Sequence, residues 1–299
     1  MSIVLQMLSV VLDGLSLGAI YALIALGYTM VYGIAKMLNF AHGDIIMVGA
    51  YVILVTVGLV ANPILAILVA VVLAVVLCSL TGVIVEKLAY KPLRTASPLA
   101  VLITAIGVSY FLQGVAQLIF GSKSRPITLP SFGTITLFGK FQVGLNTIIT
   151  LVVGALIMIA LTVFVKTTRT GRAMLAVSED KGAAQLMGVN VNRIIMTTFA
   201  IGSALAACAS FFYLIQIPSV SPTLGAMPGI KAFASAVIGG IGSIPGAMIG
   251  GILLGLVEKI CASIPVLSPY TTAIEFSLLI LILLVKPIGL LGKRRREKV

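Results

Sequence analysis

A series of apolar runs, most of them close to the length of a membrane-crossing helix, constrains the fold of this chain more than any other feature. About 20 apolar residues in a helix cross the ~30 Å hydrocarbon core of a bilayer. A helix also satisfies its own backbone hydrogen-bonding groups, which lipid cannot do. The sequence therefore predicts an all-α polytopic membrane protein. The expected spans are residues 9–32, 41–60, 64–85, 98–120, 144–165, 194–217, 230–242, 245–262 and 270–286.

The composition excludes an ordinary water-soluble domain. Of 299 residues, 60% are hydrophobic and 9% are charged, and the mean hydropathy is +1.21. A soluble domain carries about 25% charged residues, and it could not bury this much apolar surface. We expect about eight to nine transmembrane segments, because the segment 230–242 is too short to cross the bilayer alone. The first apolar stretch is long and lacks a basic leader region, so no cleavable signal peptide is expected.

The uneven distribution of basic residues predicts the orientation. Most of the 20 Lys and Arg residues fall in loop 86–97, in segment 166–193 and at the end of the chain. By the positive-inside rule these regions are cytoplasmic, and 121–143 is an external loop. The N-terminus is then outside and the C-terminus is in the cytoplasm. We interpret the basic cluster at 293–298 as an orienting tail beside anionic lipid, and not as a nucleic-acid-binding patch.

The apolar segments form two groups that flank the span 144–165. The groups cover residues 9–120 and 194–286. In the predicted orientation their first spans run in opposite directions, so the groups are inverted copies in topology, as in many transporters with a midplane pathway. Sequence similarity between the groups is faint, and the inverted repeat rests on topology alone. The whole chain, 1–299, is expected to form one transmembrane domain.

Each group contains an interruption that predicts a broken or re-entrant helix. The first is MLNFAHGD at 37–44, and the second is residues 217–251, which are rich in Gly, Pro and Ser. Proline breaks helices, and irregular backbone at membrane depth persists only where protein buries it or a cavity wets it. The glycines of 246–255 are expected to serve close helix packing. The candidate residues of a substrate pathway are Asn39, His42, Gly43, Gly229, Gly239, Gly240 and Gly242.

Three polar side chains stand at the start of the span 41–60. We expect Asn39 to cap this helix and Asp44 to complement its dipole. His42, the single histidine, is expected to be a hydrogen-bonding group at the membrane interface. A proton relay is disfavoured, because Glu258 and Glu275 map near span ends, where charged side chains reach the interface at low cost.

Residue patterns that carry catalysis or bind cofactors are absent from the sequence. The three cysteines, Cys78, Cys208 and Cys261, have neither disulfide nor metal-site spacing. GLLGKRRR at 289–296 lacks the G-x-x-x-x-G-K-S/T spacing of a phosphate loop. We therefore expect a chain that is not an enzyme and has no cofactor or metal. If ATP drives it, partner subunits must bind that ATP.

Segment 166–193 contains a candidate docking helix at about 178–188. Ser178 is expected to cap this helix, two acidic residues lie in its first turn, and Gly188 is expected to end it. Its small apolar surface fits either a docking site for a partner or a solvated loop helix. The candidate coupling residues are Glu179, Asp180, Ala183, Ala184, Met187 and Gly188.

The pattern Ala183-Ala184-x3-Gly188 resembles the loop through which permeases of ATP-binding-cassette (ABC) importers dock their ATPases, although Gly182 stands where Glu is common. Further motifs extend the resemblance along the chain. On them the chain resembles the branched-chain amino-acid ABC importer permease family, and within it the LivH-type subunit. These motifs are GAIYALIALGYTMVYGIAKMLNFAHGD (18–44), VEKLAYKPLR (85–94), GRAMLAVSEDKGAAQLMGVN (171–190), GGIGSIPGAMIGG (239–251) and KPIGLLG (286–292).

The resemblance implies a permease of the bacterial cytoplasmic (inner) membrane that carries branched-chain (aliphatic) amino acids into the cytoplasm. A second, related permease would complete the pathway. Two cytoplasmic ATPase subunits would bind ATP and dock at 166–193, and a periplasmic amino-acid-binding protein would deliver the substrate. Two alternatives stay open: an ion-coupled secondary amino-acid transporter, and an ABC permease for amides or urea.

Overall fold

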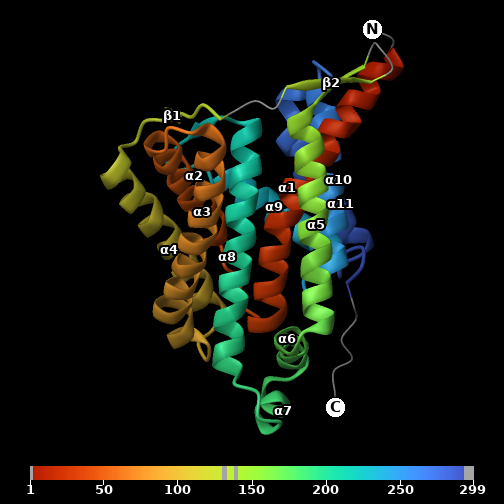
Figure 1. Cartoon of the computed structure of the whole chain (residues 1–299). Coiled ribbons are helices and arrows are strands. Elements are labelled where there is room, and N and C mark those ends of the chain that lie inside the picture. The colour runs from red at the N-terminus through yellow and green to blue at the C-terminus, as the bar shows by residue number, and fades with distance from the viewer. Residues whose placement is uncertain (1–2, 130–132, 138–140, 293–299) are drawn as a thin grey trace. The chain divides into compact units, whose positions relative to one another are not determined.

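The structure, a computed structural model, is mainly helical and describes residues 3–129, 133–137 and 141–292 (Figure 1). Among these residues, 8 helices are long and apolar enough to cross a membrane. This confirms the predicted class, an all-α polytopic membrane protein. Lys140, other parts of the predicted external loop 121–143 and the basic cluster at 293–298 lie outside the described residues.

The described helices match the predicted spans to within a few residues at most ends. They are α1 (Ile3–Ala35), α2 (His42–Leu59), α3 (Pro63–Val85), α4 (Pro98–Phe120), α5 (Leu145–Thr167), α6 (Arg169–Glu179), α7 (Lys181–Leu186), α8 (Val191–Gln216), α9 (Ala226–Gly239), α10 (Ile244–Ser263) and α11 (Thr271–Val285). With 14 residues, α9 is about 21 Å long and too short to cross alone, as expected for 230–242.

Short turns and strands complete the described elements. A π-helical turn η1 (Glu86–Tyr90) and a 3₁₀ turn η2 (Lys91–Leu93) follow α3, and the 3₁₀ turn η3 (Ser268–Tyr270) precedes α11. The strands are β1 (Arg125–Pro126), β2 (Thr134–Leu137), β3 (Phe141–Gly144) and β4 (Ser219–Val220). Strand β1 pairs antiparallel with β4, and β2 pairs antiparallel with β3.

The helices form two compact units that do not coincide with the predicted halves 9–120 and 194–286. The first unit comprises 1–29, 131–158 and 231–299, and the second comprises 30–130 and 159–230. Helix α1 of the first group packs on α10 in the first unit. Helix α8 of the second group packs on α2 and α3 in the second unit (Figure 1). This reciprocal exchange of first helices is the pattern expected of intertwined inverted repeats, which stay a prediction.

In the first unit, α1 and α10 cross at glycines. A Cβ atom on Gly18 would lie 2.7 Å from Ile252 Cα. A Cβ atom on Gly255 would collide with the backbone of Gly18, and one on Gly251 would collide with that of Ala22. Small residues let helices associate in lipid, where burial of apolar side chains gives no driving force. The packing role predicted for the glycines of 246–255 is confirmed.

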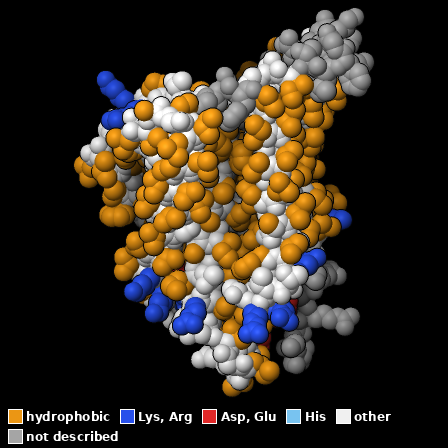
Figure 2. Space-filling view, viewed as in Figure 1, with side chains coloured by type: hydrophobic (Ala, Val, Ile, Leu, Met, Phe, Trp, Pro, Cys, Tyr) orange, Lys and Arg blue, Asp and Glu red, His pale blue; other side chains and the backbone are white. Residues whose placement is uncertain are grey.

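In the second unit, α2 and α8 are the inner helices and α4 lies outside. In an apolar stretch of 18 residues in each helix, 61% of the residues are buried in α2 and in α8, against 17% in α4. The side chains that α3 and α4 expose are large and apolar, such as Leu68 and Ile103, and Figure 2 shows such side chains over this surface. An outward apolar surface of this extent suits lipid contact.

Basic side chains gather at one end of the second unit. Figure 2 shows Lys and Arg at the end from which α6 and α7 project. The chain segments that bring them there follow α3 or precede α8. The apolar surface of this unit is therefore bounded by cations at the end that carries the predicted docking segment.

Candidate functional site

The starts of α2 and α9 meet in the second unit. A Cβ atom on Gly43 would lie 2.6 Å from the Gly225 carbonyl oxygen and 3.2 Å from Gly229 Cα. A Cβ atom on Gly225 would in turn collide with the Gly43 carbonyl. The two helix starts therefore touch backbone to backbone, and only glycine permits this approach. The structure thus brings together two of the predicted pathway glycines, Gly43 and Gly229.

Asn39 binds Tyr90 and does not cap α2. The Tyr90 hydroxyl donates to Asn39 Oδ1 at 2.8 Å, and the Tyr90 ring packs on Phe199 with centroids 5.3 Å apart. The residue directly before α2 is Ala41, which has no capping side chain, so the predicted cap was wrong. Asn39 Nδ2 is buried and has no hydrogen-bond partner in the part of the chain that the structure describes. An unpaired buried donor is costly, so this amide is suited to bind a ligand.

His42 and Asp44 lie in the first turn of α2, and both are buried, with 1% and 2% exposure. His42 is therefore inside the protein, and its role as a hydrogen-bonding group at the depth of the membrane interface stays a prediction. Asp44 lies at the positive end of the helix, as predicted. Gln113 Nε2 of α4 donates to Asp44 Oδ1 at 2.8 Å and to Ser109 Oγ at 3.3 Å.

Ser109 and Gln113 were missed by the sequence analysis, although the sequence carries a signal for them. They are four residues apart within the apolar run 98–120. Residues at this spacing share one helix face, and polar groups inside a span face the protein interior. A polar stripe within an otherwise apolar span would have predicted an inward-facing contact.

Gly239, Gly240 and Gly242 are not part of the contact between α2 and α9. Gly239 is ten residues from Gly229, about 15 Å along α9. A Cβ atom on Gly239 would collide with Gly246, which begins the close packing of α9 on α10. Gly240 and Gly242 have φ values of +105° and +93° and form the turn between these helices. In the first unit these three glycines therefore serve a turn and its packing.

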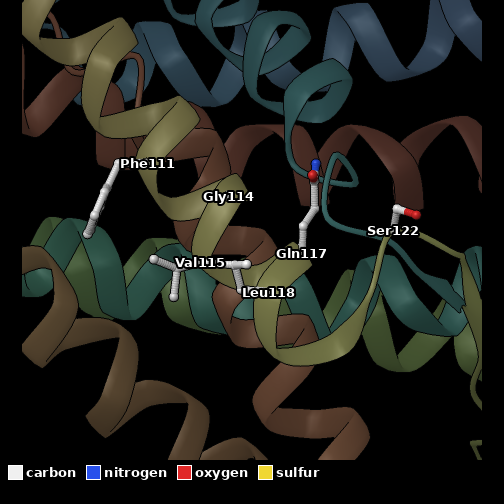
Figure 3. A pocket seen from close by; sticks show the side chains of 6 residues that line it. All are labelled: Phe111, Gly114, Val115, Gln117, Leu118 and Ser122. Carbon is white, nitrogen blue, oxygen red and sulfur yellow. The ribbon is translucent and has the colours of Figure 1, made fainter.

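Two hollows among the described residues of the second unit have no charged lining residue. One of about 530 Å³ lies along the end of α4 and includes Gln117 and Ser122. Figure 3 shows the polar ends of these two side chains pointing in different directions, so they do not converge on one ligand group. An apolar crevice of about 440 Å³ between α2, α3 and α4 includes Tyr51, whose ring stacks on Phe120 at 4.2 Å between centroids. The start of α2 therefore remains the better candidate for polar recognition.

The predicted docking helix at 178–188 consists of parts of two helices. Ser178 lies inside α6, where its hydroxyl donates to the Leu175 carbonyl at 2.7 Å, so its predicted capping role was wrong. Glu179 ends α6 and does not lie in the first turn of the next helix. Asp180 separates the helices, and its Oδ1 accepts the Ala183 N–H at 2.9 Å. Serine inside a helix can bond back to a carbonyl, which leaves the capping position to Asp180.

The apolar tip of α7 differs from the surface that the sequence predicts. Ala184 is buried, with 4% exposure, whereas Leu186 and Met187 are 90% and 84% exposed. Ala183 is exposed beside them. Gly188 has φ +82° and ends the helix as predicted. Figure 1 shows α7 beyond the end of α8. Leu186 thus replaces Ala184 in the exposed apolar surface.

Comparison with known proteins assigns the family. Residues 10–284 match the family described as "Branched-chain amino acid transport system / permease component". The chain belongs to this family. The match includes every residue of the α2–α9 contact and all of α6 and α7. The members compared are permease proteins, so this chain is a non-enzymatic component of a transport system.

Curated relatives match this permease over most of its length. The high-affinity branched-chain amino acid transport system permease protein BraD of Pseudomonas aeruginosa is 43% identical over 297 residues, which is 96% of each chain. The corresponding protein LivH of Escherichia coli K12 is also 43% identical, over 99% of this chain and 98% of the relative. The ribose import permease protein RbsC of the same strain is 25% identical over 89% of this chain and 82% of the relative.

The permease also contains a buried ionic cluster in its first unit. Lys231 Nζ of α9 lies 2.9 Å from Glu258 Oε1 of α10 and 3.2 Å from Glu275 Oε2 of α11. The Tyr21 hydroxyl of α1 donates to Glu258 Oε2 at 2.7 Å. The cluster thus links four helices of this unit. Among residues 3–129, 133–137 and 141–292, no group of three or more His, Cys, Asp or Glu could hold a metal ion.

The cluster corrects the interpretation that its acids reach the membrane interface. Glu275 is 1% exposed, and Glu258 has a side-chain exposure of 20%. Their positions near the ends of the spans were misleading, because the short α9 brings Lys231 to them. A lone lysine in an apolar segment was the available signal, since an ionisable residue inside a span usually faces a partner.

Replacing Lys231 should destabilise the permease more than replacing a neighbouring lysine. We expect Lys231→Met to lose about 3–5 kcal/mol, since it removes the cation that lies between the buried Glu275 and the partly buried Glu258. Adding Glu258→Gln and Glu275→Gln should restore most of that loss. Thermal unfolding of the purified protein measures the effect, with Lys259→Met as control. Equal unfolding temperatures for Lys231→Met and Lys259→Met would contradict a stabilising cluster.

Proposed function

We propose that the chain is the LivH-type permease subunit of an ABC importer for branched-chain amino acids. The 43% identity with BraD and LivH over nearly the whole chain carries this proposal. In the proposed system a second, related permease completes the pathway. Two cytoplasmic ATPase subunits bind the ATP, and a periplasmic amino-acid-binding protein delivers the substrate.

The proposed orientation has the end with α6 and α7 in the cytoplasm of a bacterial inner membrane. The gathering of cations at that end supports it through the positive-inside rule. The N-terminus and loop 121–143 are then outside, and the C-terminus is cytoplasmic. The described cations of loop 86–97 and segment 166–193 are Lys87, Lys91, Arg94, Lys166, Arg169, Arg172, Lys181 and Arg193.

The proposed coupling surface is the tip of α7, formed by Leu186 and Met187 within segment 166–193. Their exposures of 90% and 84% place two large apolar side chains in water in the isolated subunit. Such a surface outside the spans favours contact with a partner protein. In the importer the tip occupies a cleft of one ATPase. Transport then requires that the nucleotide bind the two conformations of the complex with different affinities.

A charged tip should uncouple the permease from its ATPases. We expect Leu186→Asp combined with Met187→Asp to lower ATP-dependent uptake at least about tenfold, because two carboxylates would be desolvated in an apolar contact. Gln185→Glu on the same helix is exposed and should transport normally. Uptake by the reconstituted complex measures both variants, and co-purification measures ATPase binding. Wild-type uptake by the double variant would contradict this docking surface.

The proposed recognition site for the ends of the amino acid lies at the start of α2. The 18-residue helix presents its positive end there, and Asn39 Nδ2 is a buried donor without a partner among the described residues. Both suit a carboxylate. Asp44 in the first turn offers the opposite charge for the ammonium group. Separation of the helix starts at Gly43 and Gly225 would open this site.

An acidic group in place of the Asn39 amide should repel the carboxylate of the substrate. We expect Asn39→Asp to lower uptake at saturating binding protein about tenfold or more, since it replaces a donor to the carboxylate by a like charge. Basal ATP hydrolysis should be unchanged. Asp13→Asn provides a control at an exposed acid. Leucine uptake and ATP hydrolysis are measured together, and an unaltered uptake rate would remove Asn39 from the pathway.

A further inference from the structure

Lys181, the first residue of α7, binds the C-terminal end of α1 in the second unit. Its Nζ donates to the Ala35 carbonyl oxygen at 2.8 Å. Ala35 is the last residue of α1, and the final carbonyls of a helix have no partner within it. A cation at this end also interacts favourably with the helix dipole. Lys181 therefore joins the predicted docking segment to a membrane-crossing helix by a direct polar contact.

The local surroundings of Lys181 otherwise disfavour a cation. Burial lowers the pKa of its ammonium group from the usual value, and the positive charge of Arg94 lowers it further. A positive charge in the first turn of α7 also opposes the dipole of that helix. The contact with Ala35 offsets these costs. The long side chain of Lys181 is therefore useful at this position because it reaches the Ala35 carbonyl at the end of α1.

The end of α1 has a second lysine, which serves as an internal comparison. Lys36, with φ +61°, ends α1, and its ammonium group binds the Gly33 carbonyl of the preceding turn. Its backbone N–H donates to the Tyr32 carbonyl at 2.9 Å. These contacts of Lys36 stay within the end of α1, whereas the contact of Lys181 crosses to α7.

The geometry of α7 favours transmission from its tip to Lys181. Asp180 fixes the start of the helix by accepting the Ala183 N–H at 2.9 Å. Lys181 and Leu186 are the first and last residues of this 6-residue helix, about 7–8 Å apart along its axis. A displacement of the exposed tip therefore moves Lys181 with it. Through Ala35 the displacement reaches α1, a helix of 33 residues that is about 50 Å long.

We infer that Lys181 is a positioning residue that transmits movement of α7 to α1 during transport. This inference rests on the proposed function, because it requires an ATPase partner at the α7 tip. The other contacts of α1 indicate what the movement reaches. On the same helix, Tyr21 donates to Glu258 of the ionic cluster, and Gly18 touches α10.

The test compares variants of the two lysines in the complete complex reconstituted in proteoliposomes. Lys181→Met keeps the length of the side chain but removes its donor and charge, and Lys181→Arg keeps both. Lys36→Met removes the lysine that binds the Gly33 carbonyl of α1. For each variant we would measure leucine transported per ATP hydrolysed, the ATP hydrolysis rate and the unfolding temperature.

We expect Lys181→Met to lower the transport-to-hydrolysis ratio at least about tenfold at a wild-type hydrolysis rate. Lys181→Arg should recover most of the ratio, and Lys36→Met should leave it unchanged. An unchanged ratio in Lys181→Met would overturn the inference. Equal losses of the ratio in Lys181→Met and Lys36→Met would also overturn it, since they would show that Lys181 only stabilises the end of α1. If Lys181→Met unfolds, Lys181→Ala, which also removes the donor and the charge, replaces it, and an unchanged ratio there overturns the inference equally.

The wild-type complex tests the proposed function separately. ATP-dependent uptake by the wild type supports the importer, and its absence contradicts the importer before any variant is compared. Uptake by the wild type together with an unchanged ratio in the Lys181 variants would contradict only the role of Lys181.

Discussion

The structure depends on backbone-to-backbone contact between helices at glycine. In a bilayer, apolar side chains gain little by leaving lipid for a helix interface, so close packing must hold the helices together. The first unit uses Gly18 and Gly255 for this purpose, and the second uses Gly43 and Gly225. In the second unit a Cβ atom on Gly82 of α3 would also lie 2.8 Å from Ser203 Cβ of α8. The contact at Gly43 differs from the others because it joins the starts of two helices, where the positive ends of the helix dipoles lie.

Polar side chains supply the connections that glycine packing cannot. The first unit holds Lys231 between two carboxylates, and in the second unit Lys181 binds the end of α1. Helix α1 is part of both units: its Tyr21 reaches the ionic cluster and its Ala35 receives Lys181. In the proposed importer, α1 is thus the element through which events at the cytoplasmic tip can reach the rest of the permease. Such a connection must differ in free energy between conformations if nucleotide is to drive transport.

The spans, their breaks and the end of α7 could be predicted because each is set by local chemistry: run length, proline and glycine. Hydrogen-bond and ion-pair partners that are distant in the sequence could not be predicted. Asn39 and Asp180 are both chemically able to cap a helix, but Asn39 is engaged by Tyr90, a residue 51 positions away. The position of Glu275 near the end of a span predicted a carboxylate that reaches the membrane interface at low cost in free energy. The structure instead pairs Glu275 with Lys231 of α9. Local sequence patterns also could not predict that α1 and α8 belong to different units from the rest of their groups. Hydropathy shows that a segment spans the membrane, but it does not show which other helices the segment packs against.

The central claim is that this permease moves branched-chain amino acids only when separate ATPases drive it. The most direct measurement is leucine accumulation in proteoliposomes that contain the chain alone or the full complex of both permeases, both ATPases and loaded binding protein. Concentrative uptake should require the full complex and ATP, and the chain alone should accumulate no leucine under a proton or sodium gradient. Gradient-driven accumulation by the chain alone would contradict the account and identify a secondary transporter.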